Sequence, residues 1–121
     1  MAIGYLYDVV IDCPDPDALA SFYRELLGGT TVTDDDGSWS TLETPNGKRV
    51  SFQRVEDYVA PRWPGQECPQ QIHFDVMVTD IDASEPLVLE LGATKLEMPR
   101  TSPGFRVYAD PVGHPFCLVT G

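Results

Sequence analysis

The chain has 121 residues, of which 42% are hydrophobic and 22% charged, and its formal net charge is −11 at pH 7. This composition and length predict one globular domain over residues 1–121. The negative charge argues against nucleic acid or an anionic membrane as a partner. Apolar runs are too short to cross a bilayer, and residues 1–12 show no signal peptide. Three cysteines without a close-spaced pair fit a reducing cytoplasm.

The first predicted elements are a strand and a helix. Residues 5–12 are apolar and β-branched, which predicts a strand. Asp15 is a natural N-cap with Pro16 at the first helical position, and apolar residues recur at helical spacing until Gly28-Gly29. Short strands are then expected near residues 30–34, 38–44 and 49–55.

A second series of elements repeats the first. The pattern Asp-x-Asp-Ala that begins at Asp15 recurs at Asp80, which predicts a second helix from about Asp80 to Leu91. Pro86 falls in the first turns of that helix, so we expect it to start late or to be kinked. Further strands are expected near residues 71–78, 93–97, 105–109 and 115–119. Each module is therefore strand, helix and three strands, with modules at about 1–55 and 71–121 and a proline-rich connector at 56–70.

The duplicated βαβββ pattern resembles the vicinal oxygen chelate superfamily. The resemblance rests on that pattern, on the opening segment Asp8–Tyr23 and on the closing segment Tyr108-Ala-Asp-Pro-Val-Gly-His-Pro-Phe116. More narrowly, the chain is similar to the glyoxalase-like and bleomycin-resistance branch. The resemblance implies an α+β fold in which two βαβββ modules form a cupped mixed or antiparallel sheet, and it implies a homodimer. It does not select a function, because the superfamily includes isomerases, ring-cleaving dioxygenases, thiol transferases and metal-free drug-binding proteins.

In that superfamily, four cup-facing side chains from the first and last strand of each module hold a divalent metal. The matching positions are Asp8, Gln53, His73 and Cys117, with Asp8 matched to His73 and Gln53 matched to Cys117 through the repeat. Asp8 and His73 suit zinc, manganese, nickel or iron, whereas Gln53 is a weak donor and Cys117 a soft one. Neither Gln53 nor Cys117 is the carboxylate that enzymes of this family use to move protons. We therefore expect no cofactor, and a divalent metal is the alternative.

Each of these residues also has a structural interpretation. The weak third and fourth ligands favour a hydrogen-bonded pair of Asp8 and His73 over a metal site. Cys117 can be explained as a small buried apolar side chain, as free cysteines usually are. Gln53 can be explained as a strand residue that forms hydrogen bonds and faces a ligand.

Aromatic residues give a second indication. Trp39 is expected to line the cup, and Phe105 is its match in the second module. Trp63 and Tyr58 lie in the connector, which could fold over the mouth of the cup. Aromatic walls with a few polar groups suit a flat organic ligand. Trp39 fits a core position equally well, and Trp63 is better explained by packing of the connector.

The sequence thus favours a cytoplasmic protein that binds a small aromatic or hydrophobic molecule, such as an antibiotic, with a role in drug sequestration or resistance. Whether it is an enzyme stays open, with binding favoured. The alternative is a metal-dependent lyase, isomerase or dioxygenase with an atypical site of Asp8, Gln53, His73 and Cys117. A structural or partner-binding module with an unused cup ranks last, because inward-facing acidic and histidine side chains are costly unless they are used.

Overall fold

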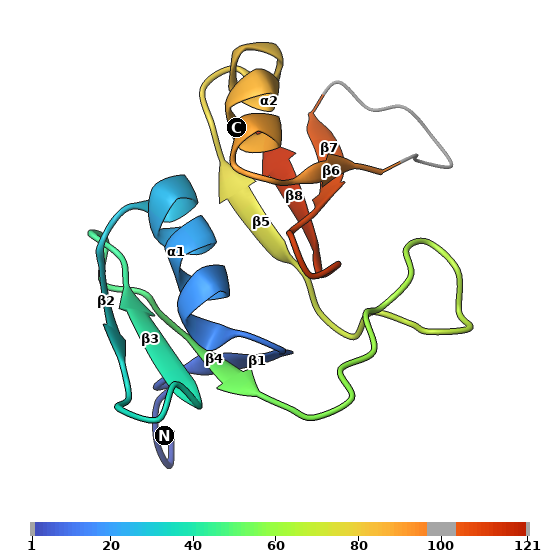
Figure 1. Ribbon diagram of the computed structural model, residues 1–121. Helices are drawn as coiled ribbons and strands as arrows, with labels where there is room; N and C mark the ends of the chain where they lie inside the picture. Colours follow the sequence, from blue (N-terminus) through green and yellow to red (C-terminus); the bar gives the residue numbers. More distant parts are fainter. Residues whose placement is uncertain (1, 97–103, 121) are drawn as a thin grey trace. The chain divides into compact units, whose positions relative to one another are not determined.

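The computed structural model describes residues 2–96 and 104–120 (Figure 1). The chain divides into two compact units, Met1–Tyr58 and Val59–Gly121, and each unit has one sheet and one helix. Each unit has the predicted order of strand, helix and three strands. Among the described residues, neither helix has the length and apolar character needed to cross a membrane.

The first module contains a four-stranded mixed sheet. Its elements are β1 (Val9–Cys13), α1 (Pro16–Leu27), β2 (Thr30–Thr33), β3 (Trp39–Glu43) and β4 (Arg49–Arg54). The strand order is β1-β4-β3-β2, with β1 parallel to β4 and the other neighbours antiparallel.

The second module repeats this topology. Its elements are β5 (Phe74–Met77), α2 (Ile81–Glu90), β6 (Thr94–Lys95), β7 (Phe105–Ala109) and β8 (Pro115–Val119). The strand order is β5-β8-β7-β6, with β5 parallel to β8 and the other neighbours antiparallel. The predicted α+β fold of two βαβββ modules is confirmed.

Both helices begin directly after an aspartate N-cap, Asp15 or Asp80. The carboxylates of Asp15 and Asp80 accept hydrogen bonds from the backbone N–H groups of Ala18 (3.3 Å) and Ala83 (3.2 Å). Each bond satisfies a donor that the first turn leaves without an intrahelical acceptor. Gly29 follows α1 with a φ of 105°, and a side chain there would lie 2.0 Å from the carbonyl oxygen of Glu43.

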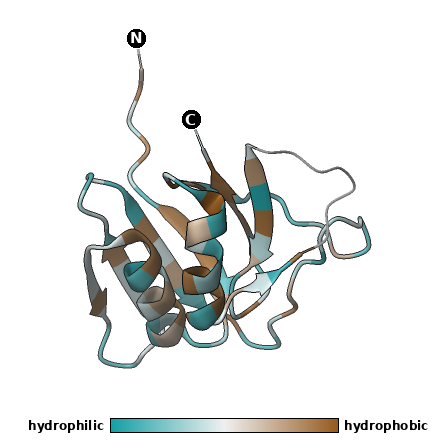
Figure 2. Cartoon of the chain, turned by 90° about the horizontal axis from the view of Figure 1, so that it is seen from above, coloured by the Kyte–Doolittle hydropathy of each residue, from teal (hydrophilic) through white to brown (hydrophobic). Residues whose placement is uncertain are grey.

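The core of the first module lies between α1 and its sheet. The rings of Tyr23 and Phe52 stack at a centroid distance of 5.7 Å, and both side chains are fully buried. Burial of a large ring of this kind contributes about 2–3 kcal/mol. Figure 2 shows hydrophobic colour in the helices and strands, whereas the turns between strands are mostly hydrophilic.

Helix α2 is held to its sheet by polar groups as well as by packing. Its buried apolar residues are Ile81 and Val88. Arg106 of β7 donates hydrogen bonds to Asp82 (2.8 Å) and Glu85 (2.9 Å) of the helix. Glu85 also accepts a hydrogen bond from the hydroxyl of Tyr108 (3.2 Å), whose pKa burial raises to about 12. Tyr108 in turn stacks on Phe116 at 5.7 Å, as Tyr23 does on Phe52.

The first strand is shorter than predicted at its amino end. It begins at Val9 rather than residue 5, and Tyr5, Leu6 and Tyr7 are exposed. The reason is the partner strand: β4 begins at Arg49, directly after a turn, so residues 5–7 have no strand to pair with.

The second helix also differs from expectation. It begins at Ile81, immediately after its N-cap, so the late start predicted from Pro86 is wrong. Pro86 lies in the second turn, where its missing N–H removes one hydrogen bond without preventing helix formation. The strand predicted at 93–97 spans Thr94–Lys95, and residue 97 lies outside the described residues.

The N-cap of α1 leads to a prediction about the stability of the protein. We expect Asp15→Ala to lower the free energy of unfolding by about 1 kcal/mol, because a helix donor loses its acceptor. Asp15→Asn keeps an acceptor oxygen and should stay near wild type. Urea denaturation followed by circular dichroism measures both. The control is Asp35→Ala in the exposed turn before β3, and an equal loss in that variant would contradict a capping role.

Candidate functional site

Each sheet has one face against its helix and one face away from it. Side chains alternate along a strand, and directly paired residues share a face. Because Phe52 contacts Tyr23 of α1, its neighbours in β4 point away from the helix. We call the surface away from α1 the first open face: Asp8, Val10, Asp12, Trp39, Thr41, Ser51 and Gln53. The second open face, away from α2, comprises His73, Asp75, Met77, Phe105, Val107, Cys117 and Val119.

A directional chain of hydrogen bonds crosses the first open face. The indole N–H of Trp39 donates to the hydroxyl of Thr41 (3.1 Å), and the Thr41 and Ser51 hydroxyls are 3.1 Å apart. The Ser51 hydroxyl donates to Oδ2 of Asp8 in a short hydrogen bond. Since each hydroxyl has one proton, Ser51 donates to Asp8 and Thr41 must donate to Ser51. The chain therefore runs from the indole to the carboxylate.

The Asp8 carboxylate at the end of this hydrogen-bond chain accepts a hydrogen bond from Ser51 through Oδ2. The Oδ1 atom of Asp8 is buried and has no hydrogen-bond partner among the described residues. A buried carboxylate oxygen without a donor is unfavourable by about 1–3 kcal/mol or more. Asp8 Oδ1 is therefore suited to accept a hydrogen bond from an incoming N–H or O–H group.

The strand pairing agrees with the predicted matching of Asp8 with His73. The hairpin pairs Glu43–Arg49 and Ala109–Pro115 align β3 and β4 with β7 and β8 at an offset of 66 residues. Val50, which pairs with Val9, is then equivalent to Phe116, which pairs with Phe74. Asp8 and His73 each stand one residue before these paired positions, so they are equivalent in the fold.

The strand pairing corrects the matching of Gln53 with Cys117. Gln53 pairs with Trp39 as Val119 pairs with Phe105, so Gln53 is equivalent to Val119, and the predicted match was wrong by two residues. Asp12 pairs with Gln53, whose side-chain amide donates to it at 3.3 Å, and Asp75 pairs with Cys117. Asp8 and Gln53 belong to the first unit and His73 and Cys117 to the second, so a four-ligand site of these residues stays a prediction.

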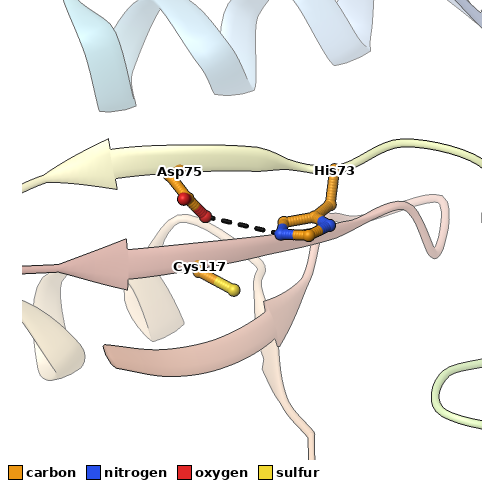
Figure 3. A group of neighbouring side chains, drawn as sticks. All are labelled: His73, Asp75 and Cys117. Atoms are coloured by element: carbon orange, nitrogen blue, oxygen red, sulfur yellow. Dashed lines mark ion pairs between the residues drawn. The ribbon is translucent and has the colours of Figure 1, made fainter. Parts of the chain in front are cut away.

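The second open face brings His73, Asp75 and Cys117 together (Figure 3). The Nε2 atom of His73 lies 3.4 Å from Oδ1 of Asp75. One ligand atom from each of the three side chains lies within 4.8 Å of the others. Burial, reinforced by the neighbouring Asp75, raises the pKa of the Cys117 thiol to about 11. Nitrogen, oxygen and sulfur donors at this spacing fit a zinc-like ion.

The aromatic candidates occupy different environments. Trp39 is half-buried and pairs with Gln53, whereas Phe105 pairs with Val119. Trp39 and Phe105 are the first residues of the equivalent strands β3 and β7, so the predicted match agrees with the strand pairing. Phe105 lies on the second open face and is 38% exposed.

The connector residues are both half-buried. Trp63 lies edge-on to the ring of His73 at a centroid distance of 6.1 Å, so the connector packs beside the second open face. The Nε1 atom of Trp63 is buried without a hydrogen-bond partner among the described residues. Tyr58 is the last residue of the first unit.

Three residues of the two open faces escaped the sequence analysis. Thr41 and Ser51 are common strand residues, and only the strand register shows that they link Trp39 to Asp8. Asp75 did have a signal in the sequence: it follows His73 by two residues in a predicted strand, which places both side chains on one face.

The chain belongs to the glyoxalase-like domain family, whose model matches residues 8–119. No curated protein matches the chain.

Solved structures with the same fold include a resistance protein, a family enzyme and an oxidase. The fosfomycin resistance protein FosX from Mesorhizobium loti is 17% identical, with a TM-score of 0.71 over 100% of this chain and 94% of that one. A glyoxalase/bleomycin resistance protein/dioxygenase family enzyme from Burkholderia phytofirmans PsJN is 16% identical, with a TM-score of 0.69 over 93% and 95%. The oxidase ChaP-H2 is 20% identical, with a TM-score of 0.67 over 99% and 95%. These likenesses establish the fold.

The hydrogen-bond chain makes a second stability prediction. We expect Thr41→Val to lower the free energy of unfolding by about 1 kcal/mol, because the Trp39 N–H loses its acceptor. The emission of Trp39 should shift with it, measured in a Trp63→Phe background so that one indole reports. The matched control is Thr30→Val in exposed β2. Equal changes in stability and in emission in both variants would contradict the hydrogen-bond chain from Trp39 to Asp8.

Proposed function

We propose that this glyoxalase-like protein binds a small organic molecule that carries a hydrogen-bond donor or a positive charge beside an aromatic or hydrophobic part. The observation that carries the proposal is the buried Oδ1 atom of Asp8, which has no donor among the described residues. A ligand N–H or O–H group would supply that donor. The formal net charge of −11 favours the approach of a cationic molecule.

The rest of the first open face supports the same ligand. Trp39 is half-buried at the other end of the hydrogen-bond chain, so part of its ring is available for contact with a flat molecule. Gln53 is exposed beside Trp39 and offers amide hydrogen bonds. An aromatic surface with a few polar groups is the usual composition of a small-molecule site.

The second open face offers apolar contact of the same kind. Met77 is 65% exposed and Phe105 is 38% exposed, and Val119 lies between them in the paired strands. These residues suit the hydrophobic part of a ligand. Sequestration of such a molecule, for instance an antibiotic, is the cellular role that we propose, in the cytoplasm.

We also propose that the protein is a homodimer. Leu87 and Leu91 lie one helical turn apart at the end of α2, and they are 64% and 37% exposed. Two exposed leucines at this spacing suit the face of a second copy.

Fluorescence quenching of Trp39 tests the binding function. In a Trp63→Phe background, titration with a panel of planar cationic and neutral aromatic compounds should identify binders with micromolar dissociation constants. Asp8→Asn removes the charge and should weaken binding of a cationic hit at least tenfold, because a desolvated charge-assisted hydrogen bond is lost.

The matched control for this experiment is Asp35→Asn, which makes the same charge change in an exposed turn. It should leave binding unchanged. No quenching by any compound at micromolar concentrations would count against the proposal, as would an equal effect of both substitutions.

A further inference from the structure

We propose that Lys48 and Arg49 form a carboxylate subsite beside Asp8, and that the ligand is an amino acid with an aromatic or apolar side chain. This inference rests on the proposed function, which assigns the positive or hydrogen-bond-donating group of the ligand to Asp8. It adds a negative group to that ligand and so narrows it to one chemical class, a zwitterion.

The carboxylate subsite is a pocket at one end of the first module. The pocket has a volume of about 390 Å³ and lies between residues 5–7, the end of β3, the start of β4 and the turn that joins these strands. Pockets that hold small organic molecules commonly measure about 300–1,000 Å³. All of the lining residues belong to the first unit, so one compact part of the chain forms the whole pocket.

The strand register places this pocket next to Asp8. Val9 pairs with Val50, and Asp8 and Arg49 each stand one residue before this pair. Ser51, which donates to Asp8, follows Arg49 by two residues in β4 and therefore points to the same face. Neighbouring strands are about 4.8 Å apart. The ammonium and carboxylate groups of an amino acid, which share one carbon atom, can therefore reach Asp8 and Arg49 together.

Arg49 is oriented before a ligand arrives. Its guanidinium group lies over the ring of Tyr7, 4.6 Å from the ring centre, and forms an ion pair with Glu43. A guanidinium group held in this way presents its remaining N–H groups in one plane, which is the geometry that binds a carboxylate through two parallel hydrogen bonds. The Arg49 side chain is 30% exposed, so a ligand can reach these groups.

The charges in the pocket favour a single negative group. Glu43, Lys48 and Arg49 are its three charged lining residues, and the ion pair of Glu43 with Arg49 balances two of them. Lys48 is exposed and has no ion pair within residues 2–96 and 104–120, so one positive charge is left. A carboxylate carries one negative charge, whereas a phosphate monoester carries close to two at pH 7. The pocket therefore matches a carboxylate.

The apolar part of the ligand also has a surface to contact. Tyr5 and Leu6 line the pocket and are 85% and 83% exposed. Trp39 is half-buried further along the first open face. A flat or apolar side chain would cover part of this exposed surface.

Calorimetry with matched compounds tests the inference. L-Phenylalanine carries both charged groups, phenethylamine only the ammonium group, and 3-phenylpropanoate only the carboxylate. We expect the wild-type protein to bind phenylalanine about tenfold more tightly than either of the other two, because each of them lacks one charge-assisted contact. L-Tryptophan and tryptamine repeat the comparison with a larger ring.

Variants assign the added affinity to the carboxylate subsite. Lys48→Gln and Arg49→Gln should each lower the ratio of phenylalanine affinity to phenethylamine affinity toward one. Lys48 is exposed, so its variant is expected to fold, and circular dichroism checks the fold of Arg49→Gln. The matched control is Arg24→Gln in α1, on the opposite side of the sheet, which should leave the ratio at its wild-type value.

Three results would overturn the inference. One is no binding of either amino acid at millimolar concentration, and another is binding no tighter than that of the matching amine. The third is an affinity ratio that neither Lys48→Gln nor Arg49→Gln changes. The proposed function is tested separately: amine binding that Asp8→Asn weakens would uphold it even where the carboxylate adds nothing.

Discussion

The burial of two phenylalanines fixes the chemistry of both open faces. Phe52 and Phe116 are fully buried, and each stacks on a tyrosine at 5.7 Å. With these rings held on the helix side of their sheets, strand alternation sends the next residues, Gln53 and Cys117, to the opposite side. A slip of one residue would exchange the two faces and bury the polar groups in the core. Packing in the core thus decides which side chains a ligand or a metal can reach.

The two modules share a fold, but different contacts hold the helix to the sheet in each. In the first module α1 packs closely on β2, β3 and β4 through buried apolar residues. In the second module Arg106 and Tyr108 bind the carboxylates of Asp82 and Glu85 on α2. A helix with only two buried apolar residues needs such polar contacts, and it leaves leucines at its surface. The two modules therefore have the same topology but differ in the contacts that hold the helix to the sheet.

Local chemistry made most of the fold predictable. Aspartate N-caps, glycine stops and apolar periodicity act over a few residues, so both helices and the order of the strands could be predicted from the sequence. The sequence repeat also matched Asp8 with His73 and Trp39 with Phe105, in agreement with the strand pairing. It failed for Gln53 and Cys117, because Phe52 and Phe116, which anchored that match, lie at positions two residues apart in the equivalent strands. The hydrogen-bond chain from Trp39 to Asp8 could not be predicted, since it runs between strands and depends on which residues pair.

The direction of the hydrogen-bond chain limits which ligand groups Trp39, Thr41, Ser51 and Asp8 can recognise. The indole N–H of Trp39 and the hydroxyl protons of Thr41 and Ser51 are all committed to the next acceptor along the chain. None of the three has a proton left to give, and the chain ends on an anion. Ethers, esters and nitro groups, which can only accept hydrogen bonds, find no counterpart along it, whereas amines, guanidines and phenols do. The strand pairing places these hydroxyl groups in a row and so sets the direction of their hydrogen bonds. That direction favours ligand groups that can donate a hydrogen bond to Asp8.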